Sequence, residues 1–250
     1  MSNQDNWNIH WEDFSESASL NPAQTYRRLL IIRQIKKIYK PSLNMIDIGC
    51  GNGDLACKLV TTFSSSSIYG IDFSDTSIEI CKQKAPTAYF FKMNLSDNSQ
   101  SIPKPLRHNA NIAICSEVLE HLDNPLLFLK KTSQLLAKHS TLIITVPSGP
   151  RSAFDMYIGH RKHFKANELK ELLLLSGYKV QAVYTAGFPF FNLYKLITIL
   201  RGQRLISDSR QKKISLLAKL VMRCFALLFK FNLKRFPGGW QLIAIATYDK

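Results

Sequence analysis

The segment Ile46-Asp47-Ile48-Gly49-Cys50-Gly51-Asn52-Gly53-Asp54 indicates the architecture of this 250-residue chain more strongly than any other stretch. A short apolar strand leads to an acidic residue and then to three glycines at alternate positions. Glycine lets the backbone turn sharply and come close to a ligand. The apolar pattern of residues 55–62 predicts a helix whose N-terminus faces that ligand. We therefore interpret the segment as a loop that binds a nucleotide cofactor.

The spacing of the glycines distinguishes between nucleotide ligands. A dinucleotide-binding loop has another small residue three positions after its second glycine, and here Asp54 occupies that position. The pattern Asp-x-Gly-x-Gly-x-Gly resembles the first motif of the class I S-adenosylmethionine (SAM)-dependent methyltransferases. The segment Ser116-Glu117-Val118-Leu119-Glu120-His121-Leu122, followed by Asp123-Asn124-Pro125, resembles the small-molecule branch of that family, which includes the ubiquinone-pathway O-methyltransferases. The resemblance implies SAM as the cofactor and methyl transfer as the activity.

The ends of the next strands carry the other expected cofactor residues. Asp72 follows Gly53 by nineteen positions, where a carboxylate can accept hydrogen bonds from both ribose hydroxyls of an adenosine ligand. Asn94 stands where the family often has an acidic residue that meets the adenine amino group, and its carbonyl oxygen can accept the same bond. The resemblance implies a SAM site made of Asp47, Gly49, Cys50, Gly51, Gly53, Asp72, Phe73, Asn94, Leu95, Cys115, Ser116 and, from the N-terminal arm, Arg27.

The order of apolar runs predicts an α/β fold with a doubly wound, seven-stranded, mostly parallel sheet. The resemblance implies that the last strand is antiparallel to its neighbours. We expect a single domain over 1–250, with a helical arm at 1–40, a SAM-binding core at 41–185 and 237–250, and a basic amphipathic helical insert at 186–236. The expected strands lie near 44–48, 67–72, 88–93, 111–115, 140–146, 178–185 and 241–248, and the core helices near 54–62, 75–84, 125–137 and 166–176.

Composition limits the classes to which the protein can belong. The five cysteines form no Cys-x-x-Cys pair, which argues against a disulfide framework and against a thiolate zinc site. Residues 1–14 lack the apolar run of a secretory leader, so we expect a cytoplasmic protein. Eleven Lys or Arg residues lie between 195 and 235 with Asp208 as the sole acid there, so this region carries most of the net charge of +15.

The insert allows several interpretations. The basic residues Lys212, Lys219, Arg223, Lys230 and Lys234 recur at helical spacing beside a broad apolar face. That pattern fits a peripheral helix at 195–235 on the inner, anionic face of a membrane, and it fits equally a lid or homodimer helix packed against the sheet. Charges inside the apolar run argue against a transmembrane span. The lack of interleaved aromatic residues does not favour nucleic acid as a partner.

The N-terminal arm is expected to lie close to the cofactor. Trp7 and Trp11 are four residues apart, which puts both rings on one helical face, and Asn21-Pro22 predicts the start of a second helix that runs to about Tyr39. The resemblance implies that such an arm closes over SAM, so that Arg27 or its neighbour Arg28 meets the SAM carboxylate. The alternative is that the arginines are solvated and the tryptophans pack against the sheet.

The expected catalytic residues follow the fourth and fifth strands, whose carboxyl ends face one crevice in an open parallel sheet. They are Glu117, His121, His160 and His163, of which the histidines are candidates for a general base or a substrate hydrogen-bond partner. The segment Glu117-x-x-Glu120-His121 also resembles the divalent-ion motif of ubiquinone-pathway O-methyltransferases and of small-RNA 2′-O-methyltransferases. An alternative metal set is therefore Glu117, Glu120, His121 and His160.

We expect methyl transfer to a small-molecule acceptor at oxygen, because a base in the crevice suits a hydroxyl group. The aromatic and apolar run at 187–194 indicates a hydrophobic or aromatic acceptor. Two alternatives belong to other classes. One is a metal-assisted RNA 2′-O-methyltransferase, and the other is a non-catalytic SAM-binding module that docks on a membrane or a protein partner.

Overall fold

The computed structural model describes residues 7–209 and 215–249 of the chain. Within these ranges seven strands form one sheet in the order β3-β2-β1-β4-β5-β7-β6, which is the predicted α/β fold. The strands are β1 (Asn44–Ile48), β2 (Ser67–Asp72), β3 (Tyr89–Lys92), β4 (Ala110–Ser116), β5 (Leu136–Pro147), β6 (Lys179–Ala186) and β7 (Gln241–Tyr248).

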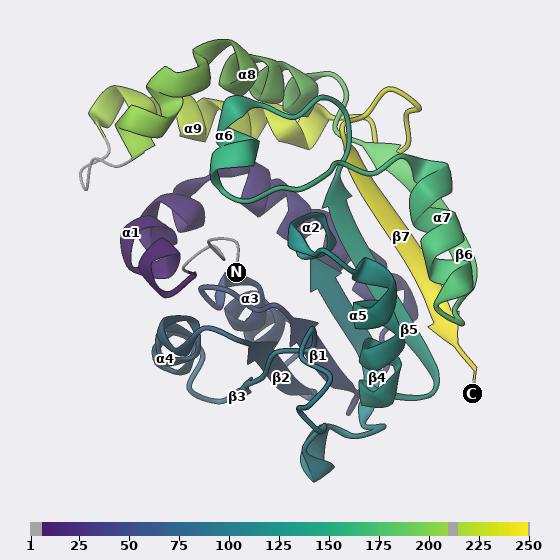
Figure 1. Cartoon of the computed structure of the whole chain (residues 1–250). Coiled ribbons are helices and arrows are strands. Elements are labelled where there is room, and N and C mark those ends of the chain that lie inside the picture. The colour runs from purple at the N-terminus through teal and green to yellow at the C-terminus, as the bar shows by residue number, and fades with distance from the viewer. Residues whose placement is uncertain (1–6, 210–214, 250) are drawn as a thin grey trace.

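Strand directions agree with the predicted doubly wound topology. The pairs β1–β2, β1–β4, β2–β3 and β4–β5 are parallel, and β7 pairs antiparallel with both β5 and β6. Figure 1 shows β7, in yellow, running opposite to β4 and β5. The carboxyl ends of the five strands in these parallel pairs therefore meet at one edge of the sheet, which is where open parallel sheets bind ligands.

The central strands are continuously apolar because helices cover both faces of the sheet. In β4, Ile112 and Ile114 pack into a cluster with α2 (Pro22–Ile38) and α3 (Asp54–Thr62). The alternate residues Ala113 and Cys115 pack on the other face with α5 (Pro125–Thr132) and α7 (Ala166–Leu175). Neighbouring positions thus reach two different cores, which fixes the register of the strand.

The helix predicted near 125–137 ends earlier than expected. The α-helix stops at Thr132, a 3-10 turn covers Ser133–Leu135, and β5 begins at Leu136. Leu136 pairs with Ala110 of β4. Residues 136 and 137, which the apolar pattern had assigned to the helix, therefore belong to the sheet. The other core helices, α3, α4 (Asp75–Lys84) and α7, have the predicted bounds to within one residue.

The arm and the insert cover the carboxyl edge of the sheet. The arm contains α1 (Trp7–Leu20) and α2, whose N-cap Asn21 accepts a hydrogen bond from Ala23 N just before the predicted start at Pro22. The insert contains α8 (Phe190–Ser209), which is interrupted by the non-helical Gly202, and α9 (Leu216–Leu228). Figure 1 shows α8 and α9 side by side beyond the short helix α6 (Ala153–Tyr157).

The basic helix expected across 212–234 does not extend as far as predicted. The α-helix ends at Leu228 and is followed by a 3-10 turn, Phe229–Phe231, so Lys234 lies beyond it, and Lys212 lies outside the described residues. Just beyond the helix, Phe229 packs against Tyr26 of α2, and Asn232 Oδ1 accepts a hydrogen bond from Phe190 N. None of the helices in the described ranges has the length and apolar character needed to cross a bilayer.

Candidate active site

The glycine loop lies where β1 ends, beside the end of β2. Gly49, Gly51 and Gly53 have left-handed φ angles of 73°, 52° and 75°, which explains why this loop requires glycine. The Asp72 carboxylate accepts hydrogen bonds from Gly51 N at 2.9 Å and from Ser74 N at 3.0 Å. The acid at the end of β2 is therefore bonded directly to the glycine loop.

The first helix of the arm lies on this loop. A Cβ atom at Gly51 would be 2.6 Å from the indole ring of Trp11, so the ring rests on the bare backbone of the loop. The ring of Trp7 meets the ring of His121 edge-on at 4.8 Å and lies 6.4 Å from that of Phe73. The arm thus reaches from the predicted cofactor residues to a predicted catalytic histidine.

Two buried carboxyl groups lie beneath the loop. Burial raises the pKa of Asp47 to about 7, with a further contribution from the neighbouring charge of Asp72. Burial also raises the pKa of Asp72, although the hydrogen bonds from Ser74 and Gly51 lower it in part. The loop therefore lies in a part of the protein where negative charge is poorly solvated.

Glu117 lies in a network that fastens the arm to the sheet. Its backbone has a left-handed φ of 57°, which turns the chain after β4. Its carboxylate lies 3.0 Å from Arg27 Nε and accepts hydrogen bonds from Gln241 Nε2 at 2.8 Å and Thr145 Oγ1 at 3.1 Å. Arg27 Nε also donates to Gln241 Oε1 at 2.9 Å. Arg27 was predicted to bind the cofactor and Glu117 to act in catalysis, whereas in the structure they form an ion pair with each other.

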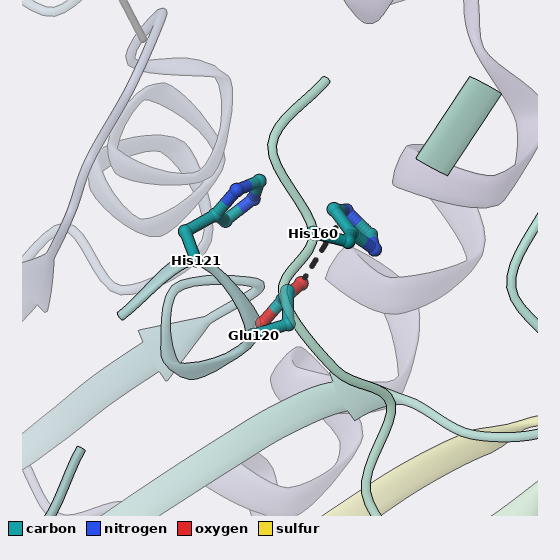
Figure 2. A group of neighbouring side chains, drawn as sticks. All are labelled: Glu120, His121 and His160. Carbon is teal, nitrogen blue, oxygen red and sulfur yellow. Dashed lines mark ion pairs between the residues drawn. The ribbon is translucent and has the colours of Figure 1, made fainter. Parts of the chain in front are cut away.

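Glu120, His121 and His160 form a compact group next to this network. Each offers a ligand atom, and the three atoms lie within 4.8 Å of one another. Figure 2 shows the three side chains turned toward one another, with Glu120 Oε1 4.0 Å from His160 Nε2. Glu120 is fully buried, and neither carboxylate oxygen has a hydrogen-bond partner among the described residues. A buried carboxylate without partners is costly, so this group requires a cation, a proton or a ligand.

The surroundings set the ionisation of this group. Burial raises the pKa of Glu120 well above its usual range, and the charge of Glu117 adds to the effect. Burial lowers the pKa of His160 far below its usual range, helped by His121. The imidazole of His160 is therefore neutral at physiological pH, as a metal ligand or proton acceptor must be.

A second cluster connects the histidines to the insert. Lys195 of α8 lies 2.8 Å and 3.0 Å from the two carboxylate oxygens of Asp155, and both side chains are buried. Burial alone would raise the pKa of Asp155. The charge of Lys195 and the hydrogen bond from Ser152 N outweigh burial, so this pKa lies below its usual range. His160 Nδ1 lies 3.1 Å from His163 Nε2, and each of these nitrogens lies 3.9 Å from Asp155. No local motif of the sequence contains Asp155 or Gln241, and none indicates that Lys195 is the partner of Asp155.

A family model described as a methyltransferase domain matches residues 39–182, which is more than half of the chain. The chain belongs to this methyltransferase family. The match spans the glycine loop, the end of β2 and the group formed by Glu120, His121 and His160. The predicted enzyme class and the predicted cofactor, SAM, are confirmed.

Several curated relatives of this methyltransferase are enzymes of quinone biosynthesis. It is 26% identical over 196 residues to a ubiquinone biosynthesis O-methyltransferase of Rickettsia canadensis, covering 70% of this chain and 79% of that protein. It is 42% identical over 64 residues to a ubiquinone/menaquinone biosynthesis C-methyltransferase of Geotalea daltonii, covering 24% of this chain and 27% of that protein. Two further relatives described as ubiquinone biosynthesis O-methyltransferases match over 45% and 58% of their own length. The names of these relatives are those of small-molecule methyltransferases, and none of them names an RNA substrate.

Solved structures agree on the fold. A SAM-dependent methyltransferase of Thermotoga maritima has a TM-score of 0.63 with 15% sequence identity, covering 98% of this chain and 99% of that chain. At this identity the likeness concerns the fold alone.

The residues at the carboxyl edge of the methyltransferase sheet fit SAM. The glycine loop presents bare backbone that a Cβ atom would obstruct, and Asp72 stands beside it at the end of β2. Asn94 follows β3, where its Oδ1 accepts a hydrogen bond from Ser96 N, and Ser116 ends β4 bonded to Thr145 Oγ1 at 2.8 Å. The fold gathers these residues at one edge, while Arg27 lies in the Glu117 network. Their individual contacts with SAM stay predictions.

The aromatic run at 187–194 has a different role from the one predicted. Phe191 is buried against Tyr26 of α2 and Phe229 at the end of α9, with ring centroids 5.6 Å apart in both pairs. Phe188 stacks on Phe236 at 4.4 Å. Phe191 thus packs the insert against the arm, whereas Phe188 packs against another residue of the insert, so these rings give no information about the acceptor.

Proposed function

We propose that this methyltransferase transfers the methyl group of SAM to a hydroxyl oxygen on a small, quinone-type aromatic acceptor. The relatives in the ubiquinone and menaquinone pathways support the acceptor class. They include both O- and C-methyltransferases, so the choice of oxygen rests on the chemistry of the site. The observation that carries it is the group of Glu120, His121 and His160 at the carboxyl end of β4.

A hydroxyl acceptor must lose its proton as it attacks the methyl carbon. A phenol has a pKa of about 10, so a proton acceptor within hydrogen-bond reach accelerates the reaction at neutral pH. His121 is partly exposed beside Trp7 of the arm, and the buried His160 meets its ring edge-on at 4.7 Å. We assign proton removal to His121, with His160 and Glu120 positioning its ring. When bound, SAM supplies a methyl group already activated by positively charged sulfur.

A divalent cation in the same group is the second candidate, and the unpartnered oxygens of Glu120 favour it. One carboxylate and two imidazoles are a suitable donor set for magnesium, manganese or zinc. Glu120, His121 and His160 would hold the ion, which would lower the pKa of a coordinated acceptor hydroxyl. Glu117, the fourth residue of the metal alternative, is engaged by Arg27 and lies outside this group.

A comparison of two variants tests the proposal. With a phenolic acceptor, His121→Ala should reduce turnover by about two to four orders of magnitude, while the SAM dissociation constant from calorimetry stays near the wild-type value. Lys58→Ala, an exposed change on α3, is the matched control and should alter neither quantity. Methylation of an aniline in preference to the corresponding phenol would contradict the choice of oxygen.

Dialysis against a chelator separates the two roles of the group. If turnover by the wild type survives dialysis, His121 acts as the base. If turnover is lost and one divalent ion restores it, the group holds a cation, and Glu120→Gln should then abolish the restoration because it removes the anionic ligand.

A further inference from the structure

The outward surface of the insert exposes an unusual number of large apolar side chains. Leu216 and Leu217 of α9 are 86% and 71% exposed, and Leu200 of α8 is 77% exposed. Other apolar side chains of the two helices and of the following turn are exposed to a smaller extent. We call the whole set the α8–α9 surface, and its apolar residues are Leu193, Leu196, Ile197, Leu200, Leu216, Leu217, Leu220, Val221, Leu227 and Phe231. Single exposed leucines are ordinary, whereas a patch this large on a soluble domain marks an interaction site.

The spacing of the exposed residues shows that α9 has two apolar faces. Phe225 is buried and, with Phe229 of the following turn, packs against the arm. Leu217, Leu220 and Leu227 follow the period of the helix on the side that points away from this core, and all three are exposed. The inner face is satisfied by packing, so the outer leucines are not needed to fold the insert.

Basic residues border the apolar stripe of α9. Lys219 and Arg223 lie on α9 beside this stripe, and Lys230 follows at helical spacing in the 3-10 turn after the helix. Among the residues that the structure describes, none of these three side chains forms an ion pair. Across 195–235 the sequence offers eleven basic residues and only Asp208 as an acid. The α8–α9 surface therefore combines exposed apolar side chains with three basic side chains that form no ion pair with any described residue.

This combination selects one kind of partner. A second copy of the chain would bring two strongly positive surfaces together, which electrostatic repulsion opposes. A nucleic acid would place exposed leucines against phosphates, with no gain from burying them. An anionic lipid bilayer accepts both features, because the leucines enter the acyl boundary while lysine and arginine meet the headgroup phosphates.

We propose that the α8–α9 surface docks the protein peripherally on an anionic lipid bilayer. The helices lie in the plane of the membrane interface and do not cross it. Docking involves the element that carries Lys195, whose partner Asp155 stands beside His160 and His163, so the membrane lies directly behind the candidate active site. The inference rests on the surface itself and holds for any acceptor.

Flotation with vesicles tests the charge of the surface. The wild type should float with vesicles of phosphatidylcholine mixed with phosphatidylglycerol at low salt, and it should remain at the bottom with phosphatidylcholine alone or in high salt. Changing Lys219, Arg223 and Lys230 together to Gln should weaken binding about fivefold per charge, or roughly a hundredfold in all. The matched control changes the exposed lysines Lys58, Lys82 and Lys170 to Gln, which removes the same charge elsewhere and should have a much smaller effect.

A second pair of variants tests the apolar component. Leu217→Gln with Leu220→Gln should abolish flotation, whereas Leu174→Gln with Leu175→Gln should not, although the latter leucines of α7 are 52% and 62% exposed. Every variant should bind SAM as the wild type does, which separates this test from the proposed activity. Failure of the wild type to float at low salt, or equal losses in test and control variants, would overturn the proposal. If the wild type does not float but forms a dimer in solution, and the Leu217/Leu220 variant is monomeric, the partner is a second copy of the chain instead.

Discussion

Replacing Arg27 with methionine should destabilise the protein far more than it weakens SAM binding. Arg27 Nε lies 3.0 Å from Glu117 Oε2, and the two side chains are only 10% and 11% exposed. Methionine retains most of the apolar stem and removes the guanidinium. The change therefore reports on the charge that the arm contributes to the network of Glu117 and Gln241, and only secondarily on packing.

The cost follows from the contacts that Glu117 keeps. Removing one partner of a buried ion pair typically costs about 3–5 kcal/mol, because the other charge is left unpaired. Glu117 retains hydrogen bonds from Gln241 and Thr145 at 2.8 Å and 3.1 Å, so we expect about 3 kcal/mol, the lower end of that range. For a chain of this length the loss corresponds to a fall in Tm of about 6–12 °C. Adding Glu117→Gln to Arg27→Met should recover part of the loss, because no buried charge then remains.

Urea unfolding monitored by circular dichroism measures the stability, and calorimetric titration measures SAM affinity in the same samples. Arg33→Met, an exposed change on the same helix, is the control and should alter stability by less than about 0.5 kcal/mol. The reasoning fails if Arg27→Met unfolds like the wild type while its SAM dissociation constant rises tenfold or more. Arg27 would then be a cofactor ligand, as the sequence had indicated.

Three further predictions concern the residues around the site. Gly51→Ala should abolish SAM binding in calorimetry, because its φ of 52° disfavours a side chain and its Cβ would lie 2.6 Å from Trp11. The pKa of Asp47 is about 7 in the folded state and about 3.9 when unfolded, so its contribution to stability is full below about pH 4 and is lost as the pH rises through 7. In urea unfolding across that window, this group lowers the free energy of unfolding of the wild type by about 1.4 kcal/mol per pH unit, and the Asp47→Asn variant should lack this decline. Lys195→Met should lower the free energy of unfolding by about 3 kcal/mol, because Asp155 is left buried without its cation; an unchanged urea midpoint would contradict this.

Local patterns in the sequence account for most of the fold. The central strands β1 and β4 are mostly apolar runs whose alternate residues enter two cores, so their positions can be predicted without knowledge of their neighbours. The glycine loop and the start of α2 at Pro22 depend on the backbone preferences of single residues. Where the apolar pattern suits both a helix and a strand, strand pairing determines the structure. Leu136, for example, was predicted to be helical but pairs with Ala110 in the sheet.

The candidate site was only partly predictable. Glu120, His121 and His160 could be anticipated because they follow strands that end at the same edge of the sheet. The pairing of Glu117 with Arg27 and Gln241, which lie 90 residues before it and 124 residues after it, has no local signature. The ion pair of Asp155 with Lys195 likewise joins two elements 40 residues apart. Such contacts depend on how the arm and the insert pack, which the spacing of residues within each element does not encode.

The fate of an isotopically labelled methyl group tests the central claim most directly. The purified protein is incubated with methyl-labelled SAM and a hydroxylated aromatic acceptor, and the product is examined by mass spectrometry and by the NMR shift of the labelled carbon. We expect one label per product molecule with the shift of a methyl ether, and no labelled product from the His121→Ala variant above a small residual level. A label bound to nitrogen or carbon, or no transfer to any aromatic acceptor while SAM still binds, would contradict an oxygen-directed small-molecule methyltransferase.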